Sequence, residues 1–109
     1  MKILDNPYTI VDWSKITPVN YPGETGYAIW QTVELGNVRV RMVEYSAGYL
    51  ADHWCNRGHV ILVLDGEVTS EIKDGEKSVL KAGMGYQVSD DIAPHRSSTE
   101  KGAKLFIVD

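Results

Sequence analysis

Four side chains in this sequence have the chemistry of metal ligands. Two of the three histidines, His53 and His59, flank the only cysteine, Cys55, and the third histidine, His95, lies far downstream. Imidazole nitrogen and thiolate sulfur form a ligand set that suits Zn(II), Fe(II), Ni(II) or Cu better than Mg(II) or Ca(II). Because one site can account for every histidine and the only cysteine, we predict that these four residues bind one divalent transition metal.

A purely structural role is the competing interpretation. A single cysteine often packs as a small apolar side chain, and an isolated histidine is often part of a core. The spacing nevertheless has a geometric consequence. In an extended segment His53 and Cys55 point to the same face, and Gly58 permits a turn before His59.

The elements that must position these side chains are short strands. From Tyr27 onward, apolar and β-branched runs are separated by glycine-containing turns, and no stretch shows helical periodicity. This pattern predicts an all-β domain over residues 27–109, built as an antiparallel sandwich or barrel. Residues 1–26 hold three of the four prolines and indicate an extended N-terminal arm. We expect this arm to pack on the barrel or on a dimer partner.

One hairpin is predicted with its register. The turn Gly36-Asn37 suits a tight connection and places Glu34 opposite Arg39, an opposite-charge pair that favours this alignment. We expect this pair, with Arg41, on a partly solvated face. The opposite face is the expected core face: Ile29, Gln31, Val33, Leu35, Val38, Val40, Met42 and Glu44.

The polar residues on the expected core face have two interpretations. Buried polar groups need partners, so Gln31 and Glu44 either form the rim at one barrel end or line a pocket. On the second interpretation we predict Gln31, Met42 and Tyr86 as substrate-binding residues. Glu44 is the carboxylate that we nominate as a general base.

Two predicted strands are apolar at every position, whereas a strand with one face in solvent should alternate apolar and polar residues. They are Val60–Leu64 and Leu105–Val108. Their outer faces must therefore be covered by the N-terminal arm, a second subunit, or both. On this ground we predict a homodimer.

Composition restricts the partners and the compartment. The 109 residues carry a net charge of -4, which argues against nucleic acid or an anionic membrane as the main partner. A single cysteine forms no internal disulfide and is typical of a reducing compartment. The N-terminal sequence has no signal-peptide pattern and no apolar run is long enough to span a bilayer, so we expect a cytoplasmic protein without membrane contact.

The stretch from Gly48 to Gly66 resembles the first motif of the cupin family, in which two histidines, a glutamate and a closing glycine recur at fixed spacing. The spacing from His53 to Gly66 matches in full, while Gly48 is one residue closer than the motif requires. Cys55 stands in place of the second histidine and His59 in place of the glutamate.

The second cupin motif is matched less completely. His95 occupies the position of its histidine, and Lys81-Ala82-Gly83 resembles the turn that precedes it. Asp90 and Ile92 stand where proline and glycine are expected, and Thr99 replaces an asparagine. The resemblance covers residues 38–109.

The resemblance implies an RmlC-like jelly-roll barrel with a metal at its centre. In detail it is closest to short single-domain cupins with an Asp-His, Cys and Trp signature, here Asp52-His53-Trp54-Cys55. Carried over by position, the resemblance implies that the ligands are His53, Cys55, His59 and His95. His59 could instead contact the other ligands without binding the metal itself.

Three functions follow from this resemblance. The leading one is a metal-dependent enzyme of dioxygenase-like or related oxidoreductase chemistry on a small molecule. The second is a non-catalytic module that binds or senses a small ligand. The third is a closed structural zinc site made of cysteine and histidines, for which the cysteine substitution is an argument.

Overall fold

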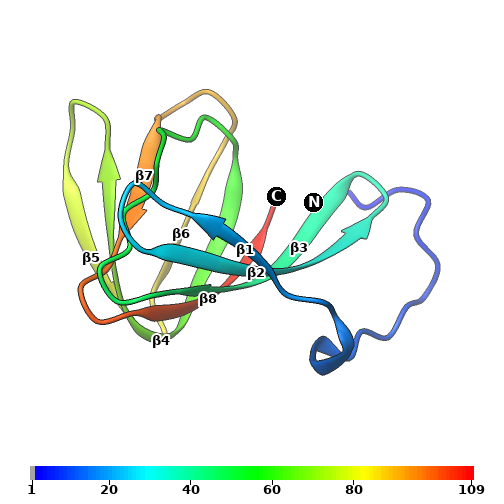
Figure 1. The fold of residues 1–109 in the computed structure, drawn as a ribbon. Helices are drawn as coiled ribbons and strands as arrows, with labels where there is room; N and C mark the ends of the chain where they lie inside the picture. The colour runs from blue at the N-terminus through cyan, green and yellow to red at the C-terminus, as the bar shows by residue number, and fades with distance from the viewer. Residues whose placement is uncertain (1) are drawn as a thin grey trace.

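The computed structural model describes residues 2–109, and its elements are one short 3-10 helix followed by strands (Figure 1). They are η1 (Trp13–Lys15), β1 (Val19–Pro22), β2 (Tyr27–Leu35), β3 (Val38–Tyr45), β4 (His59–Ile72), β5 (Lys77–Lys81), β6 (Gly85–Val88), β7 (His95–Ser98) and β8 (Ala103–Val108). No helix among these residues is long and apolar enough to cross a membrane.

The long strand β4 belongs to both layers of an antiparallel barrel. Its first half pairs with β8 and β6, and β8 continues through β3 and β2 to β1. Its second half pairs with β5 on one side and β7 on the other. Every strand pair is antiparallel. The predicted all-β architecture, an antiparallel barrel, is therefore confirmed.

Gly66 bends β4 rather than ending it. Glycine often interrupts a strand, but β4 continues through this position to Ile72. The pairing with β8 shifts register between Val63 and Asp65, and Gly66 has a φ of +78°. A Cβ at this position would overlap the carbonyl oxygen of Gly102, so the close approach of these two backbone segments requires glycine. This bend passes β4 from one sheet to the other.

The β2–β3 hairpin has the predicted register but the opposite orientation. Glu34 lies opposite Arg39 as expected. However, Val43, Tyr45 and Arg41 are buried, whereas Glu44 on the other face is exposed. The prediction of the core face was wrong because the inward-facing arginines have buried partners within the barrel, described below.

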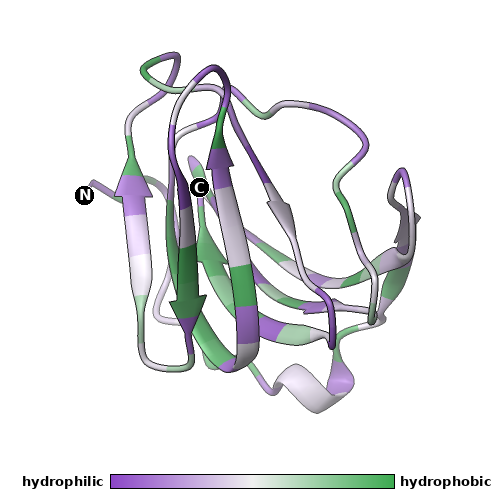
Figure 2. Cartoon of the chain, turned by 90° about the vertical axis from the view of Figure 1, so that its left-hand side faces the viewer, coloured by the Kyte–Doolittle hydropathy of each residue, from purple (hydrophilic) through white to green (hydrophobic). Residues whose placement is uncertain are grey.

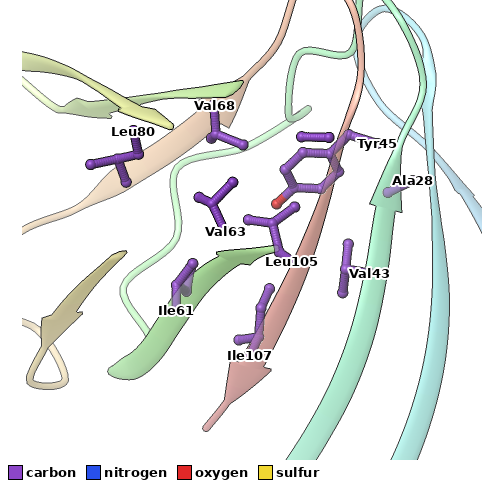
Figure 3. Packing of buried hydrophobic residues seen from close by; sticks show 10 residues of the cluster. Ala28, Val43, Tyr45, Ile61, Val63, Val68, Leu80, Leu105 and Ile107 are labelled. Carbon is purple, nitrogen blue, oxygen red and sulfur yellow. The ribbon is translucent and has the colours of Figure 1, made fainter. Parts of the chain in front are cut away.

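The core is made by inward side chains of both sheets (Figure 3). Val63 and Leu105 lie at its centre, with Val43 and Ile107 on one side and Val68 on the other. Alternate residues of β4, including Ile61 and Val63, are buried, as period-two burial requires.

The N-terminal arm lies against the outer face of the hairpin. Gln31 Nε2 donates to the carbonyl oxygens of Trp13 and Ile16 at 2.7 and 2.9 Å. The Trp13 ring meets Phe106 edge-on, with ring centres 6.5 Å apart. The partly buried Gln31 therefore holds the arm in place.

The arm leaves much apolar surface uncovered. The outward residues of β4, Val60, Leu62 and Leu64, are exposed, and Tyr8 in the arm is 96% exposed. Figure 2 shows hydrophobic and hydrophilic stretches alternating along the strands nearest the viewer. The sequence correctly indicated that β4 is apolar on both faces, and the outward Val60, Leu62 and Leu64 remain 41–45% exposed.

Candidate metal centre

Backbone pairing brings Cys55 beside His95. The two residues form an isolated antiparallel bridge, with the Cys55 N–H donating to the His95 carbonyl at 2.7 Å and the reverse bond at 3.0 Å. Residues directly opposite in such a pair place their side chains on the same face. The thiol and the imidazole therefore start from neighbouring positions on one sheet.

His59 reaches the same point from the other sheet. It is the first residue of β4, where the strand pairs with β6, whereas His95 begins β7 and pairs with the far end of β4. Their Nε2 atoms are 2.7 Å apart. Cys55, His59 and His95 can each offer a ligand atom, and these atoms lie within 4.8 Å of one another.

The other ring nitrogen of each histidine is held by an oxygen acceptor. His95 Nδ1 lies 2.6 Å from the carbonyl oxygen of Ala93, which can only accept, so this nitrogen carries the proton. His59 Nδ1 lies 3.4 Å from the carboxylate of Asp109. Metal-binding histidines commonly donate their second N–H in this way, which fixes the tautomer and aims the free nitrogen at the metal.

The two Nε2 atoms are close enough that either a proton or a metal ion must lie between them, because two unprotonated nitrogens would repel each other. Burial and the neighbouring His59 lower the pKa of His95 against the opposing effect of its bond to Ala93. Burial therefore disfavours a charged His95, and the two imidazole nitrogens and the Cys55 sulfur form a donor set that a metal ion fits. Two imidazoles and one thiolate suit Zn, Fe, Ni or Cu. The cluster could thus hold a transition metal.

His53 lies outside this cluster. Its side chain is 74% exposed, and its Nδ1 is 2.6 Å from Asp52. It sits at the edge of the same cavity but is not among the three grouped ligands. The structure therefore assembles three of the four predicted ligands and leaves His53 at the surface.

A cavity of about 380 Å³ opens over the cluster. All three candidate ligands line it, and aromatic side chains form part of its walls: Trp30, Tyr45, Tyr49, Trp54 and Tyr86. The Tyr45 and Tyr49 rings stack with centres 4.3 Å apart. This volume lies at the lower end of the range for small-molecule pockets.

Tyr86 is the one predicted substrate-binding residue that lies in this cavity. Its hydroxyl is 3.4 Å from His59 Nε2. Burial raises the pKa of Tyr86, so the hydroxyl stays protonated at neutral pH and can donate a hydrogen bond.

The remaining predicted residues lie elsewhere. Gln31, Met42 and the exposed Glu44 face the outside of the hairpin, where they line a separate surface hollow with Pro18 and Lys104. Glu44 is not near the metal ligands because alternate residues of a strand point to opposite faces. The structure therefore does not bring these three residues to the candidate centre.

Arginines that the sequence placed in solvent line the cavity instead. Arg39 and Arg41 project inward from β3, and Arg57 approaches from the loop after Cys55. All three converge on the side chain of Asp109, at 2.8, 2.7 and 3.8 Å. The guanidinium of Arg41 also stacks over Trp30, at 4.2 Å from the ring centre.

Asp109 is the residue that connects the arginines to the metal ligands. Burial works against its ionisation, but hydrogen bonds from His59 and Arg39 and the charges of Arg41 and Arg39 hold the pKa of Asp109 below its usual value. Sequence reasoning missed Asp109. The inward position of Arg41 did have a signal in the sequence, because the apolar Val43 and Tyr45 share its face of β3.

Comparison with solved structures supports the fold, whereas comparison with family models and curated proteins finds no match. Among solved structures the chain is similar to an RmlC-like cupin from Shewanella frigidimarina, with 18% identity, a TM-score of 0.75 and coverage of 94% of this chain and 89% of the other. It is also similar to a predicted oxalate decarboxylase from Thermotoga maritima, with 15% identity and a TM-score of 0.74. This match covers 92% of this chain and 96% of the other.

The Fe(II) form of HppE is similar at 18% identity with a TM-score of 0.77; the match covers 96% of this chain but 62% of HppE. Identities at this level establish the fold alone. Together with the antiparallel topology, these likenesses show that the chain has the fold of a small cupin.

Proposed function

We propose that this protein is a metal-dependent enzyme of oxidoreductase type that acts on a small molecule bound in the cavity above Cys55, His59 and His95. The observation that carries the proposal is the pair of facing Nε2 atoms, each on a ring whose Nδ1 has an oxygen acceptor, beside a thiol and under an open cavity. Iron or copper bound there would supply electron transfer, and zinc would supply Lewis acidity.

The residues of the cavity have assignable tasks around such a centre. His59 and His95 present nitrogen ligands from two different sheets, and Cys55 presents sulfur. The aromatic walls exclude water from the substrate and orient its body. The protonated Tyr86 hydroxyl donates a hydrogen bond to a group held near His59.

The cavity argues against proton abstraction by a carboxylate. Asp109 is the acidic residue among those that line it, and its oxygens already face donors from Arg39, Arg41 and His59. A carboxylate occupied in this way is a poor proton acceptor for a substrate. Glu44, the base that the sequence suggested, lies on the outer face.

The two alternatives differ in how the metal would be coordinated. A closed structural zinc site needs four protein ligands, whereas three are grouped and they face a cavity. A sensing module shares the open site but performs no turnover. The similarity in fold to both Fe(II) HppE and a predicted oxalate decarboxylase is compatible with catalysis.

Two further expectations belong to this proposal. The exposed outer residues of β4 support a homodimer. The single cysteine supports a reducing, cytoplasmic location, and the net charge of -4 gives no reason to expect nucleic acid or membrane as a partner.

Cobalt substitution tests the open site directly. We expect Co(II) bound to the protein to show a thiolate charge-transfer band that the Cys55→Ser variant lacks, and azide to change the visible spectrum by occupying a free position. A spectrum that azide leaves unchanged would indicate a closed site. For the Fe(II) protein, oxygen consumption with a bound small molecule would separate an enzyme from a sensor.

A further inference from the structure

The cavity above the candidate metal centre carries an excess of positive charge. Three guanidinium groups, those of Arg39, Arg41 and Arg57, face one carboxylate, Asp109. The fourth arginine of the lining, Arg96, is neutralised by an ion pair with Glu71 at 2.7 Å. The formal excess within the cavity is two positive charges before any metal is counted.

Part of this charge, on Arg41, is held where water can satisfy it only partly. The side chain of Arg41 is 6% exposed and that of Asp109 is 1% exposed. Arg41 donates through Nη2 to Asp109, but its buried Nε has no hydrogen-bond partner among the described residues. Uncompensated charge in a protein interior is costly, and a second anion would offset that cost.

The position of this cluster relates it to the metal ligands. Asp109 contacts Arg41 at 2.7 Å and His59 at 3.4 Å, so the guanidinium groups lie one residue away from the cluster of Cys55, His59 and His95. A small molecule whose charged end meets the arginines would place its next atoms over the metal ligands. Arginine suits this role because its planar fork can hold both oxygens of a carboxylate or phosphate.

We infer that the ligand of this cavity is a small organic oxyanion, a carboxylate or phosphate carried on a compact and partly aromatic or apolar body. The charged group binds Arg41 and Arg57, and the body lies between the aromatic walls. The cavity of about 380 Å³ restricts the ligand to a small molecule. The inference rests on the proposed function only in that the substrate would occupy this same cavity.

Matched probes test the inference by calorimetry. Benzoate, phenyl phosphate and neutral benzamide share one flat body and differ in charge. We expect at least one of the two anions to bind wild-type protein tenfold or more tightly than benzamide. Preference for benzoate identifies a carboxylate site, and preference for phenyl phosphate identifies a phosphate site.

Variants then assign the preference to the arginines. Arg57 is 52% exposed on a loop, so Arg57→Met should fold normally and lower the anion preference severalfold; Arg41→Met should lower it further. Lys104→Met removes the same charge from the outer surface and should change nothing. Asp109→Asn should tighten anion binding because it removes the competing carboxylate.

Three results would overturn the inference: equal affinity for benzamide, no binding of either anion, or a preference that survives the Arg57 variant. Repeating the titrations after chelation separates this inference from the proposed function. Anion preference in a protein that binds no metal would refute the metal centre and leave the oxyanion site standing. Full metal binding without anion preference would refute the oxyanion site alone.

Discussion

Asp109 shows how a single side chain can determine the orientation of a whole hairpin. Arginines are rarely buried without partners, and the inward positions of Arg39 and Arg41 depend on the carboxylate that both contact. The same carboxylate faces His59 Nδ1. It therefore orients the imidazole ring whose Nε2 atom points at the candidate metal site.

Removing the charge of Asp109 should destabilise the fold. Asp109→Asn leaves the buried Arg41 and the partly buried Arg39 without a counter-charge, and we expect a loss of about 3 kcal/mol in the free energy of unfolding. Urea denaturation measures it. The exposed Asp65→Asn is the matched control and should change stability by less than about 0.5 kcal/mol. Equal effects of the two substitutions would show that Asp109 does not organise this cluster.

At the scale of residues, the sequence supplied part of the site. Cys55, His59 and His95 were recognisable because their types are scarce and their positions resemble a known motif. His53 matched the same motif, yet its side chain turns to Asp52 at the surface. Asp109 was not predictable, because nothing in its local sequence shows that it meets residues near position 40 in the fold.

The long strand β4 is the element on which the barrel depends. It contributes His59 to the first sheet and pairs with β7, which carries His95, in the second. The bend at Gly66 lets this one strand belong to both sheets, so the geometry of the candidate centre depends on this glycine.

Substitution of Gly66 tests that dependence. Gly66→Ala should cost about 3 kcal/mol or more, because the positive φ alone costs roughly 1–2 kcal/mol and the new methyl group must also displace Gly102. Gly83→Ala is the control, since Gly83 also has positive φ but open space around it; it should cost about 1 kcal/mol. Thermal unfolding of both variants provides the comparison. Similar losses would mean that no close packing constrains the bend.

At the scale of elements, strand positions and one hairpin register followed from the sequence, but the inward face did not. Cross-strand pairing of Glu34 with Arg39 fixed the register correctly. It says nothing about which face is buried. The expected core face contained Ile29, Val33 and Val40, which are only partly buried because they form the outer surface of the barrel next to the N-terminal arm.

The whole molecule presents an apolar outer surface that a monomer would leave in water. Val60, Leu62 and Leu64 are exposed side by side on β4, and Tyr8 and Ile10 of the arm project without cover. Exposed apolar residues along one strand face, as on β4, are typical of a protein–protein interface. They support the homodimer that the sequence suggested from the uninterrupted apolar run of β4.

Light scattering tests the dimer. The wild-type protein should have twice the 12.2 kDa mass of one chain at micromolar concentration. Leu62→Glu should convert it to a monomer, since a charge on the outer face of β4 opposes association. Val79→Glu, at an exposed apolar position on β5, should remain a dimer. A monomeric wild type, or loss of the dimer in both variants, would contradict this assignment.

The most direct test of the account is the metal content of four single variants purified without an affinity-column metal and measured by plasma mass spectrometry. Wild-type protein and His53→Ala should each retain about one transition metal ion per chain. Cys55→Ser, His59→Ala and His95→Ala should lose most of it, because each removes one of three grouped ligands. Unchanged metal content in His95→Ala, or a loss in His53→Ala as large as in His95→Ala, would contradict the three-ligand centre.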